Sequence, residues 1–120
     1  MTREVFTHID NRQQFHEILC QNKIVVIKFG ADWCGPCKKI KDLFYNKIMN
    51  LNSQILVGDV DVDESFDVYA FLKSKKMVNG IPVILAYKAN NESFIPDLSV
   101  TGTNETEIIN FFNEINRWEI

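Results

Sequence analysis

Hydrophobic and polar residues follow one another along this chain in blocks that predict alternating strands and helices. Two apolar runs rich in β-branched residues, 24–29 and 55–61, have the pattern of buried parallel strands. A third run, 82–87, opens with a proline, at a position where a strand loses no ladder hydrogen bond. A short first strand is expected over residues 5–9.

Between these runs the apolar residues recur at helical spacing. One helix is expected after Asp10, which would act as its N-cap, and others over 38 to about 50 and about 65 to 75. The pattern Asn104-x-x-Glu107 has the spacing of a capping box and predicts the start of a last helix. The apolar members of the third helix are Phe66, Tyr69, Phe71 and Leu72, and the residues of the last helix expected to face the core are Ile108, Phe111, Phe112 and Ile115.

The order strand, helix, strand, helix, strand, loop, strand, helix predicts an α/β domain with a parallel core and an antiparallel edge. Asn90 and Asn91 indicate a turn before the last strand. Pro96 cannot donate to a ladder, so the segment from Phe94 to Ser99 is expected to depart from a regular strand. We also expect this segment to alter the rim near Gly102.

The composition describes an ordinary globular chain, 46% hydrophobic and 24% charged over 120 residues, and we expect a single domain over 1–120. A net charge of −3 gives no electrostatic footprint for nucleic acid or an anionic membrane. The start of the chain leads into no hydrophobic signal segment and no run is long enough to span a bilayer, so a cytoplasmic protein is expected. In a reducing compartment a cysteine pair is more often catalytic or metal-binding than structural.

The candidate chemistry lies at Cys34 and Cys37, between the first long strand and the second helix. Two cysteines three residues apart lie about one helical turn from each other and can close a disulfide without rebuilding the backbone. Free N–H groups at a helix start favour an anion, and the thiolate is the form of cysteine that attacks disulfides. The pattern therefore indicates thiol–disulfide exchange.

The run Trp33-Cys34-Gly35-Pro36-Cys37, with Gly80-Ile81-Pro82 further on and Gly102 before the last helix, resembles the thioredoxin family. The resemblance covers nearly the whole chain. It implies the thioredoxin fold, with a central mixed sheet of about five strands flanked by about four helices. It also implies a protein-disulfide reductase that needs no bound cofactor or metal, takes part in electron transport and cell redox homeostasis, and is recycled by a thioredoxin reductase.

The resemblance, together with the order of the two cysteines, assigns roles to the site residues. Cys34, at the exposed mouth of the turn, is the expected nucleophile, and Cys37 is expected to resolve the mixed disulfide. Gly35 keeps the approach free of a side chain, and Pro36 fixes φ where no N–H is needed. Trp33 is either a flat shield beside the disulfide or a core residue. Ile81, Pro82 and Gly102 are expected to bind substrate, with the Ile81–Pro82 bond cis.

Two positions depart from what the family typically carries. Lys28 stands where the family has a buried aspartate, and Asp59 stands where it has the lysine partner, so the pair is expected to be exchanged and internal. The alternative is that Lys28 extends its ammonium group to the surface. Asp42 replaces a helix-kinking proline, which predicts a straighter helix. Compared with the family, the stretch from Asp63 to Pro82 is about four residues longer.

The expected partners are disulfide-containing proteins and a thioredoxin reductase, and the chain is expected to be a monomer. Another class of function is a non-redox binding subunit of a larger assembly. A zinc site is the third hypothesis, although His8 and His16 are expected at the surface and not as ligands. Cys20 is either an unreactive, partly buried thiol or a regulatory or dimer-forming cysteine. The lysines at 38, 39 and 41 form either a solvated face or a positive rim beside the thiolate.

Overall fold

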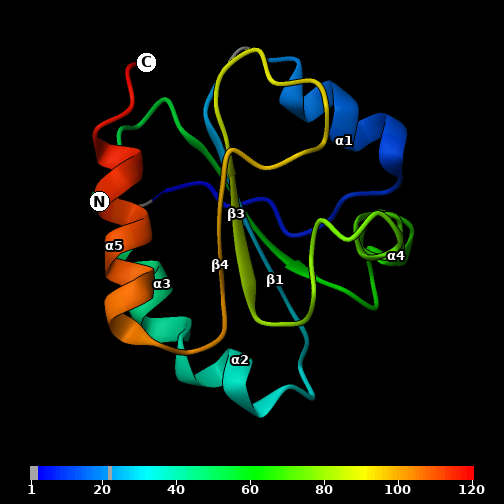
Figure 1. The fold of residues 1–120 in the computed structure, drawn as a ribbon, viewed down its shortest axis with the longest axis horizontal. Helices are drawn as coiled ribbons and strands as arrows, with labels where there is room; N and C mark the ends of the chain where they lie inside the picture. The colour runs from blue at the N-terminus through cyan, green and yellow to red at the C-terminus, as the bar shows by residue number, and fades with distance from the viewer. Residues whose placement is uncertain (1–2, 22) are drawn as a thin grey trace.

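The structure, a computed structural model, describes residues 3–21 and 23–120. Within them a mixed sheet has four strands in the order β2-β1-β3-β4 (Figure 1). The central strand β1 (Val25–Gly30) runs parallel to β2 (Leu56–Asp61) and antiparallel to β3 (Val83–Tyr87), and β3 pairs antiparallel with β4 (Leu98–Thr101). All six residues of β1 are buried, as its continuous apolar run predicts.

Helices cover both faces of this sheet. Those within the described ranges are α1 (Arg12–Leu19), α2 (Gly35–Lys39), α3 (Lys41–Ile48), α4 (Phe66–Ser74) and α5 (Glu105–Asn116). One core cluster joins the sheet to α3 and α5, and a second joins it to α1 and α4. The α/β class and the mixed sheet are confirmed, with one strand fewer and one helix more than expected. No helix of the described residues is both long and apolar enough to cross a bilayer.

The strand expected over 5–9 is wrong, because the segment makes a single parallel bridge between Phe6 and Gly58. The Phe6 N–H donates to the Val57 carbonyl at 3.0 Å, and the Asp59 N–H donates to the Phe6 carbonyl at 2.9 Å. The Ile9 N–H then donates to Ser65 Oγ at 3.0 Å. The chain therefore leaves the edge of β2 and turns toward the start of α4 before a ladder can form.

The first helix begins one residue later than expected, because Asn11 and not Asp10 is its N-cap. Asn11 Oδ1 accepts the N–H of Gln14 at 2.9 Å. The side chain of Gln14 in turn accepts the Asp10 N–H at 2.5 Å. The bond to Asn11 satisfies one amide of the first helical turn, and the bond from Asp10 holds the residue before the N-cap against the same turn.

The continuous helix expected from 38 to about 50 is also wrong. The chain breaks at Ile40, whose φ of −99° and ψ of 0° separate α2 from α3 without any proline. Ile40 is only 2% exposed and packs in the same cluster as Phe44 and Ile48. The break therefore lets α2 carry the cysteine turn while Ile40 is still buried in the core.

In the ten-residue connection between β3 and β4, residues 94–97 depart from a regular strand, as predicted, whereas Leu98 and Ser99 already belong to β4. Phe94 has a φ of 65°, and its ring lies 5.2 Å from that of Phe15 in α1 and 5.4 Å from that of Phe71 in α4. The hydroxyl of Tyr87 donates to the Phe94 carbonyl at 2.9 Å. The loop thus anchors an aromatic ring between two helices.

The predicted effect of this segment on the rim near Gly102 is wrong. The antiparallel register pairs Leu98 with Ala86 and Thr101 with Val83, so the loop and Gly102 lie at opposite ends of β3 and β4. In Figure 1 the yellow loop is at the top, and α2 is at the bottom. The additional residues therefore act on α1 and α4.

The last two helices follow their patterns with one exception. Asn104 Oδ1 accepts the Glu107 N–H at 3.0 Å, and all four residues predicted to face the core in α5 are buried. In α4 the buried residues are Val68 and Leu72, four apart on one face, whereas Phe66 is 70% exposed. Phe66, an apolar member of this helix, lies two positions before Val68 and points away from that buried face.

Candidate active site

The cysteine pair lies in the turn that leads from β1 into α2. Cys34 is the N-cap of α2, and its N–H donates to the Ala31 carbonyl at 3.1 Å. The N–H of Cys37 donates to Cys34 Sγ at 3.2 Å. Pro36 lies in the first helical turn, where its missing N–H is not needed. The two cysteines form a disulfide with their Cα atoms 5.3 Å apart, so the predicted pairing is confirmed.

The expected difference in exposure between the two cysteines is wrong for this disulfide state. Cys34 is 5% exposed and Cys37 is 6% exposed. A Cβ atom placed at Gly35 would have no neighbour within 4 Å, so the space beside the disulfide is open. Exposure therefore does not distinguish the two sulfurs.

The disulfide lies where the ends of three strands converge. The strand register pairs Phe29 with Val83, which sets Pro82 across from Gly30. The Ile81–Pro82 bond is cis, as predicted, and the N–H of Gly102 donates to the Pro82 carbonyl at 2.9 Å. A Cβ atom at Gly30 would lie 3.3 Å from Cys37 Sγ. Glycine at the end of β1 thus allows the sulfur to approach the backbone closely.

The indole of Trp33 lies on the surface, so the core alternative for this residue is wrong. Trp33 is 69% exposed, and its Nε1–H donates to Asp63 Oδ2 at 2.7 Å. This hydrogen bond connects the turn before α2 to the loop after β2. Phe66, also largely exposed, adds a second aromatic surface residue just beyond that loop.

Lys28 and Asp59 form the internal pair that the exchanged residues predict. Lys28 Nζ lies 3.3 Å from Asp59 Oδ1, with the two side chains 6% and 24% exposed. The two residues are direct partners in the register of β1 and β2. The alternative in which Lys28 reaches the surface is wrong, because its ammonium group lies 5.0 Å from the centre of the Phe44 ring. A cation–π contact and an ion pair together compensate the buried charge.

Tyr45 completes this polar cluster, and the sequence analysis did not anticipate it. Its hydroxyl donates to Asp59 Oδ2 at 2.5 Å. Burial, the hydrogen bond to Asp59 and the charge of Asp59 raise the pKa of Tyr45 well above its usual value. The phenol therefore remains a donor to the carboxylate at neutral pH. The only sequence signal for this contact was the position of Tyr45, four residues after Lys41 in the helix expected beside the Lys28–Asp59 pair.

A cavity of about 280 Å³ connects the Lys28–Asp59 pair to Cys37. Lys28, Asp59 and Cys37 all line it, together with Lys38 and Lys41. A water molecule in this space could bridge Asp59 to Cys37. Since Lys38 and Lys41 border the same cavity, the arrangement favours the interpretation of the lysines as a positive rim.

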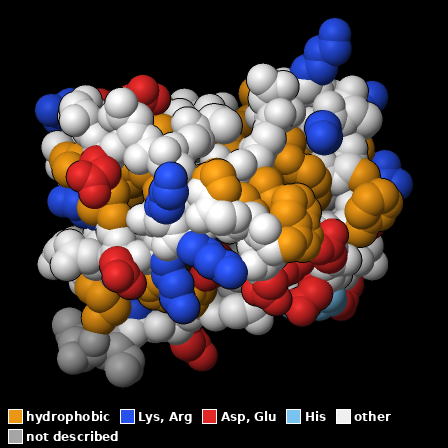
Figure 2. All heavy atoms as spheres, turned by 90° about the horizontal axis from the view of Figure 1, so that it is seen from below, with side chains coloured by type: hydrophobic (Ala, Val, Ile, Leu, Met, Phe, Trp, Pro, Cys, Tyr) orange, Lys and Arg blue, Asp and Glu red, His pale blue; other side chains and the backbone are white. Residues whose placement is uncertain are grey.

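The surface around the turn carries separated charges. Figure 2 looks onto the α2 end of the molecule and shows basic side chains beside a group of acidic ones, with hydrophobic side chains exposed next to them. The exposed lysines of this end include Lys38 and Lys39 in α2, and Asp63 follows β2. The site therefore offers an apolar contact with charges of both signs at its border.

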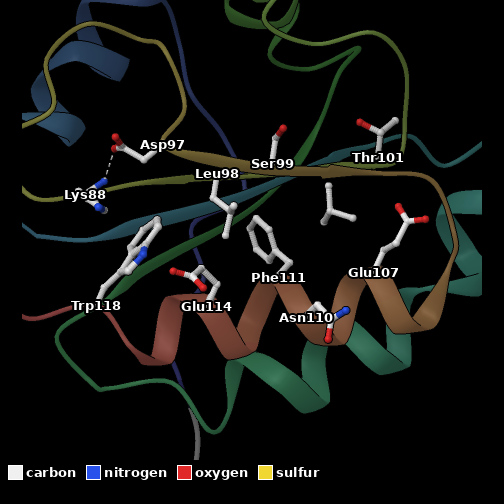
Figure 3. Close-up of a pocket in the computed structure, with 11 residues that line it drawn as sticks. Lys88, Asp97, Leu98, Ser99, Thr101, Glu107, Asn110, Phe111, Glu114 and Trp118 are labelled. Carbon is white, nitrogen blue, oxygen red and sulfur yellow. Dashed lines mark hydrogen bonds between the residues drawn. The ribbon is translucent and has the colours of Figure 1, made fainter.

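A second hollow lies away from the cysteines, between the edge strand β4 and α5 (Figure 3). It has a volume of about 660 Å³, and Leu98, Phe111 and Trp118 supply its apolar wall. Glu107 and Glu114 extend from α5 along the same groove. None of its lining residues is a cysteine, so this groove does not take part in the disulfide chemistry.

Comparison with known proteins agrees with this geometry. The thioredoxin family model matches residues 6–114. Thioredoxin 1 of Plasmodium falciparum is 32% identical over 80 residues, which are 67% of this chain and 72% of that protein. The oxidised form of mitochondrial thioredoxin 3 from Saccharomyces cerevisiae superposes with a TM-score of 0.72 at 27% identity, covering 91% of this chain and 94% of the other.

One similar protein is much longer than this chain. The protein disulfide isomerase-like 2-3 of Oryza sativa subsp. japonica is 36% identical over 87 residues, which are 72% of this chain but 19% of that protein. The chain thus spans about a fifth of that relative. It belongs to the thioredoxin family and has the thioredoxin fold. It carries the C-x-x-C pair with which members of this family act as disulfide oxidoreductases.

Proposed function

We propose that this chain reduces disulfides of other proteins in the cytoplasm and is recycled by a thioredoxin reductase. The observation that carries the proposal is the Cys34–Cys37 disulfide in the turn before α2, with an amide donor directed at Cys34 Sγ and open space at Gly35. Gly35-Pro36 between the cysteines favours reduction over isomerisation. Three cysteines, two of them in the pair, suit a reducing compartment.

The reaction transfers two electrons from the dithiol to the substrate. The Cys34 thiolate attacks one sulfur of the substrate disulfide, so a Cys34–substrate bond forms and one substrate thiolate leaves. Cys37 then loses its proton and attacks Cys34 Sγ, which forms the Cys34–Cys37 bond and releases the second substrate thiolate. The substrate thiolates take up two protons, and the reductase returns two electrons from NADPH to the chain.

Asp59 is the proposed acceptor of the Cys37 proton, directly or through one water in the shared cavity. Lys28 holds this carboxylate in place and adds positive charge near the sulfurs. The exchanged pair thereby supplies a carboxylate from β2 where the family resemblance places one on β1. Tyr45 fixes the other oxygen of Asp59.

Substrate recognition is assigned to the loops around the disulfide. An extended substrate segment would pair with the backbone beside Ile81 and Pro82, in the manner of an added strand. Gly102, whose φ is 96°, turns the chain at the end of β4 and donates to the Pro82 carbonyl. Trp33 and Phe66 offer apolar contact at the border of this surface.

Reduction of insulin by dithiothreitol tests the proposal. The wild-type chain should accelerate the precipitation of insulin, Cys34→Ser should abolish turnover, and Cys37→Ser should accumulate mixed disulfides through Cys34. Cys20→Ser is the matched control, because it removes a cysteine outside the turn and should retain turnover. A wild-type chain without turnover would favour the alternative of a non-redox binding subunit. Mixed disulfides trapped on Cys37 in the Cys34→Ser variant would reverse the two roles.

Recycling, location and oligomeric state need separate measurements. NADPH oxidation with a thioredoxin reductase and the oxidised chain should proceed in proportion to the chain added. Light scattering should give the mass of a monomer, 13.9 kDa. A tagged chain should distribute with cytoplasmic markers on fractionation, and enrichment in an organelle would contradict the proposed location.

A further inference from the structure

The end of the molecule opposite the disulfide brings together three side chains with metal-binding atoms. His16 and Cys20 lie four residues apart at the end of α1, and Glu92 comes from the loop between β3 and β4. One ligand atom from each residue lies within 4.8 Å of the others. Residues i and i+4 of a helix face the same side, which is the spacing by which two helical side chains share one ion.

We propose that His16, Cys20 and Glu92 bind one Zn²⁺ ion that joins the end of α1 to the β3–β4 loop. A water molecule would complete a four-coordinate site. The proposal concerns a site separate from Cys34 and Cys37 and does not depend on the reductase function.

The distances between the three side chains suit a tetrahedral ion. Cys20 Sγ lies 3.6 Å from His16 Nδ1 and 3.1 Å from Glu92 Oε1. With Zn–S of about 2.3 Å and Zn–N or Zn–O of about 2.0–2.1 Å, tetrahedral ligand atoms lie about 3.5 Å apart. The sulfur–nitrogen distance already has this value, but Sγ is almost equally far from Nε2, at 3.7 Å, so the imidazole has to turn to direct one nitrogen at the ion. The sulfur–oxygen distance needs to open by a few tenths of an ångström. Glu92 is exposed, so its carboxylate can make this adjustment without disturbing the core.

The chemistry of the ligand set selects a borderline-soft ion. A thiolate and an imidazole favour Zn²⁺ over Ca²⁺ and Mg²⁺, which prefer several oxygen ligands. Thiolate and carboxylate together supply two negative charges, so they neutralise a divalent cation, and the imidazole binds in its neutral form. The ion would take the place of the proton that Cys20 Sγ donates to Glu92 in the metal-free structure.

The loop that carries Glu92 is held in place on both sides of that residue. Asn91 donates from Nδ2 to the Ile95 carbonyl at 2.8 Å and to Asp97 Oδ2 at 2.9 Å. Phe94, two residues after Glu92, packs its ring 6.0 Å from that of His16. The same loop insertion thus positions one ligand and contacts another, which gives the departure from a regular strand a metal-binding role.

The experiment uses the full chain with its active-site disulfide oxidised and any intermolecular dimers removed. Since the sequence has three cysteines, Cys20 is then the only thiol, and its reaction with a disulfide reagent such as DTNB reports on this site alone. One equivalent of Zn²⁺ should protect Cys20 from the reagent, whereas Mg²⁺ and Ca²⁺ should not. Co²⁺ should bind with the same stoichiometry and give thiolate-to-metal charge-transfer absorption with visible bands of a four-coordinate ion.

Three variants identify the ligands. Cys20→Ser should lose the charge-transfer absorption, and His16→Ala and Glu92→Gln should each lose the protection by Zn²⁺ at one equivalent. Glu17→Gln, on the same helix but outside the cluster, is the matched control and should keep both signals. Circular dichroism of each variant checks that the fold is retained. Undiminished reaction of Cys20 in the presence of Zn²⁺, or full Co²⁺ binding by Glu92→Gln, would overturn the site and leave only a thiol–carboxylate hydrogen bond.

Discussion

Cys34 and Cys20 lie at opposite kinds of helix end, one at the start of a helix and the other at the end of a helix. Cys34 is the N-cap of α2, where its sulfur accepts an N–H, and Cys20 is the C-cap of α1, where its sulfur donates to the Glu92 carboxylate. Amide donors favour a thiolate, whereas the hydrogen bond to Glu92, burial and the charges of Glu92 and Glu17 raise the pKa of Cys20. One residue type is thus prepared for attack at one end of the molecule and kept protonated at the other.

The largest expected effect is a difference in alkylation rate between the two sites. In the reduced, metal-free chain at neutral pH, iodoacetamide should modify Cys34 on the order of 50-fold faster than Cys20, because the thiolate fraction at a helix N-terminus is far larger. Mass spectrometry of peptides from timed samples measures both rates. Similar rates at the two cysteines would show that the helix ends do not distinguish the sulfurs.

A substitution in the β3–β4 loop should lower the stability of the chain and leave the activity of the disulfide end unchanged. Phe94→Ala removes the ring between α1 and α4 and should lower the free energy of unfolding by about 2 kcal/mol, less than for a fully buried Phe because Phe94 is half-buried. Urea unfolding measures this loss. Insulin reduction by the folded variant should stay within twofold of wild type, since the loop lies opposite the disulfide. Ile95→Ala, at an exposed position of the same loop, is the control.

Removing the charge of Asp59 should slow the chemistry at the disulfide, and it should also lower the free energy of unfolding because Lys28 loses its buried partner. Asp59→Asn should slow resolution of the mixed disulfide about tenfold while its formation changes less, because the amide cannot take the Cys37 proton. Rapid-quench sampling with a model disulfide substrate separates the two steps. Tyr45→Phe keeps the carboxylate and should have the smaller effect. Equal slowing of both steps by Asp59→Asn would assign the residue to positioning of the loop.

The smallest expected effect is at Cys20. Glu92→Gln in the metal-free chain should lower the pKa of Cys20, because the carboxylate that accepts its hydrogen and repels the thiolate is lost. The pH profile of Cys20 alkylation should therefore shift to lower pH. In the wild type, the raised pKa contributes stability that is present below the unfolded-state pKa and lost as pH rises through the folded-state pKa. A profile that does not move would assign the shift to burial.

The sequence predicted the parts of the site that lie together in the chain or in one strand register. The Cys34–Cys37 pair, the cis bond before Pro82 and the Lys28–Asp59 pair all follow from local pattern or family resemblance. The predictions of a first strand and of a continuous second helix were wrong, and the structure shows tertiary contacts at both places. The Ile9 N–H donates to Ser65 Oγ, and the second helix is interrupted at Ile40, which is buried in the core.

The Cys20 cluster could not be predicted because its members are far apart in sequence. Cys20 and Glu92 are separated by 72 residues and meet only because Phe94 fixes the loop against α1 and α4. Hydrophobic periodicity indicates which face of a helix or strand is buried. It does not indicate which distant loop packs beside that element. The same limit explains Tyr45, whose helical position was predicted but whose hydrogen bond to Asp59 was not.

The exchanged pair on β1 and β2 also restricts how this chain can diverge. Because Lys28 and Asp59 are adjacent in register and Lys28 is buried, changing Lys28 to aspartate alone would set two carboxylates side by side. Changing Asp59 to lysine alone would place two ammonium groups there. Either intermediate would cost about 3 kcal/mol or more, as expected when one partner of a buried pair is removed. A single substitution therefore cannot reverse the orientation of this pair without passing through a destabilised chain, so both positions would have to change together.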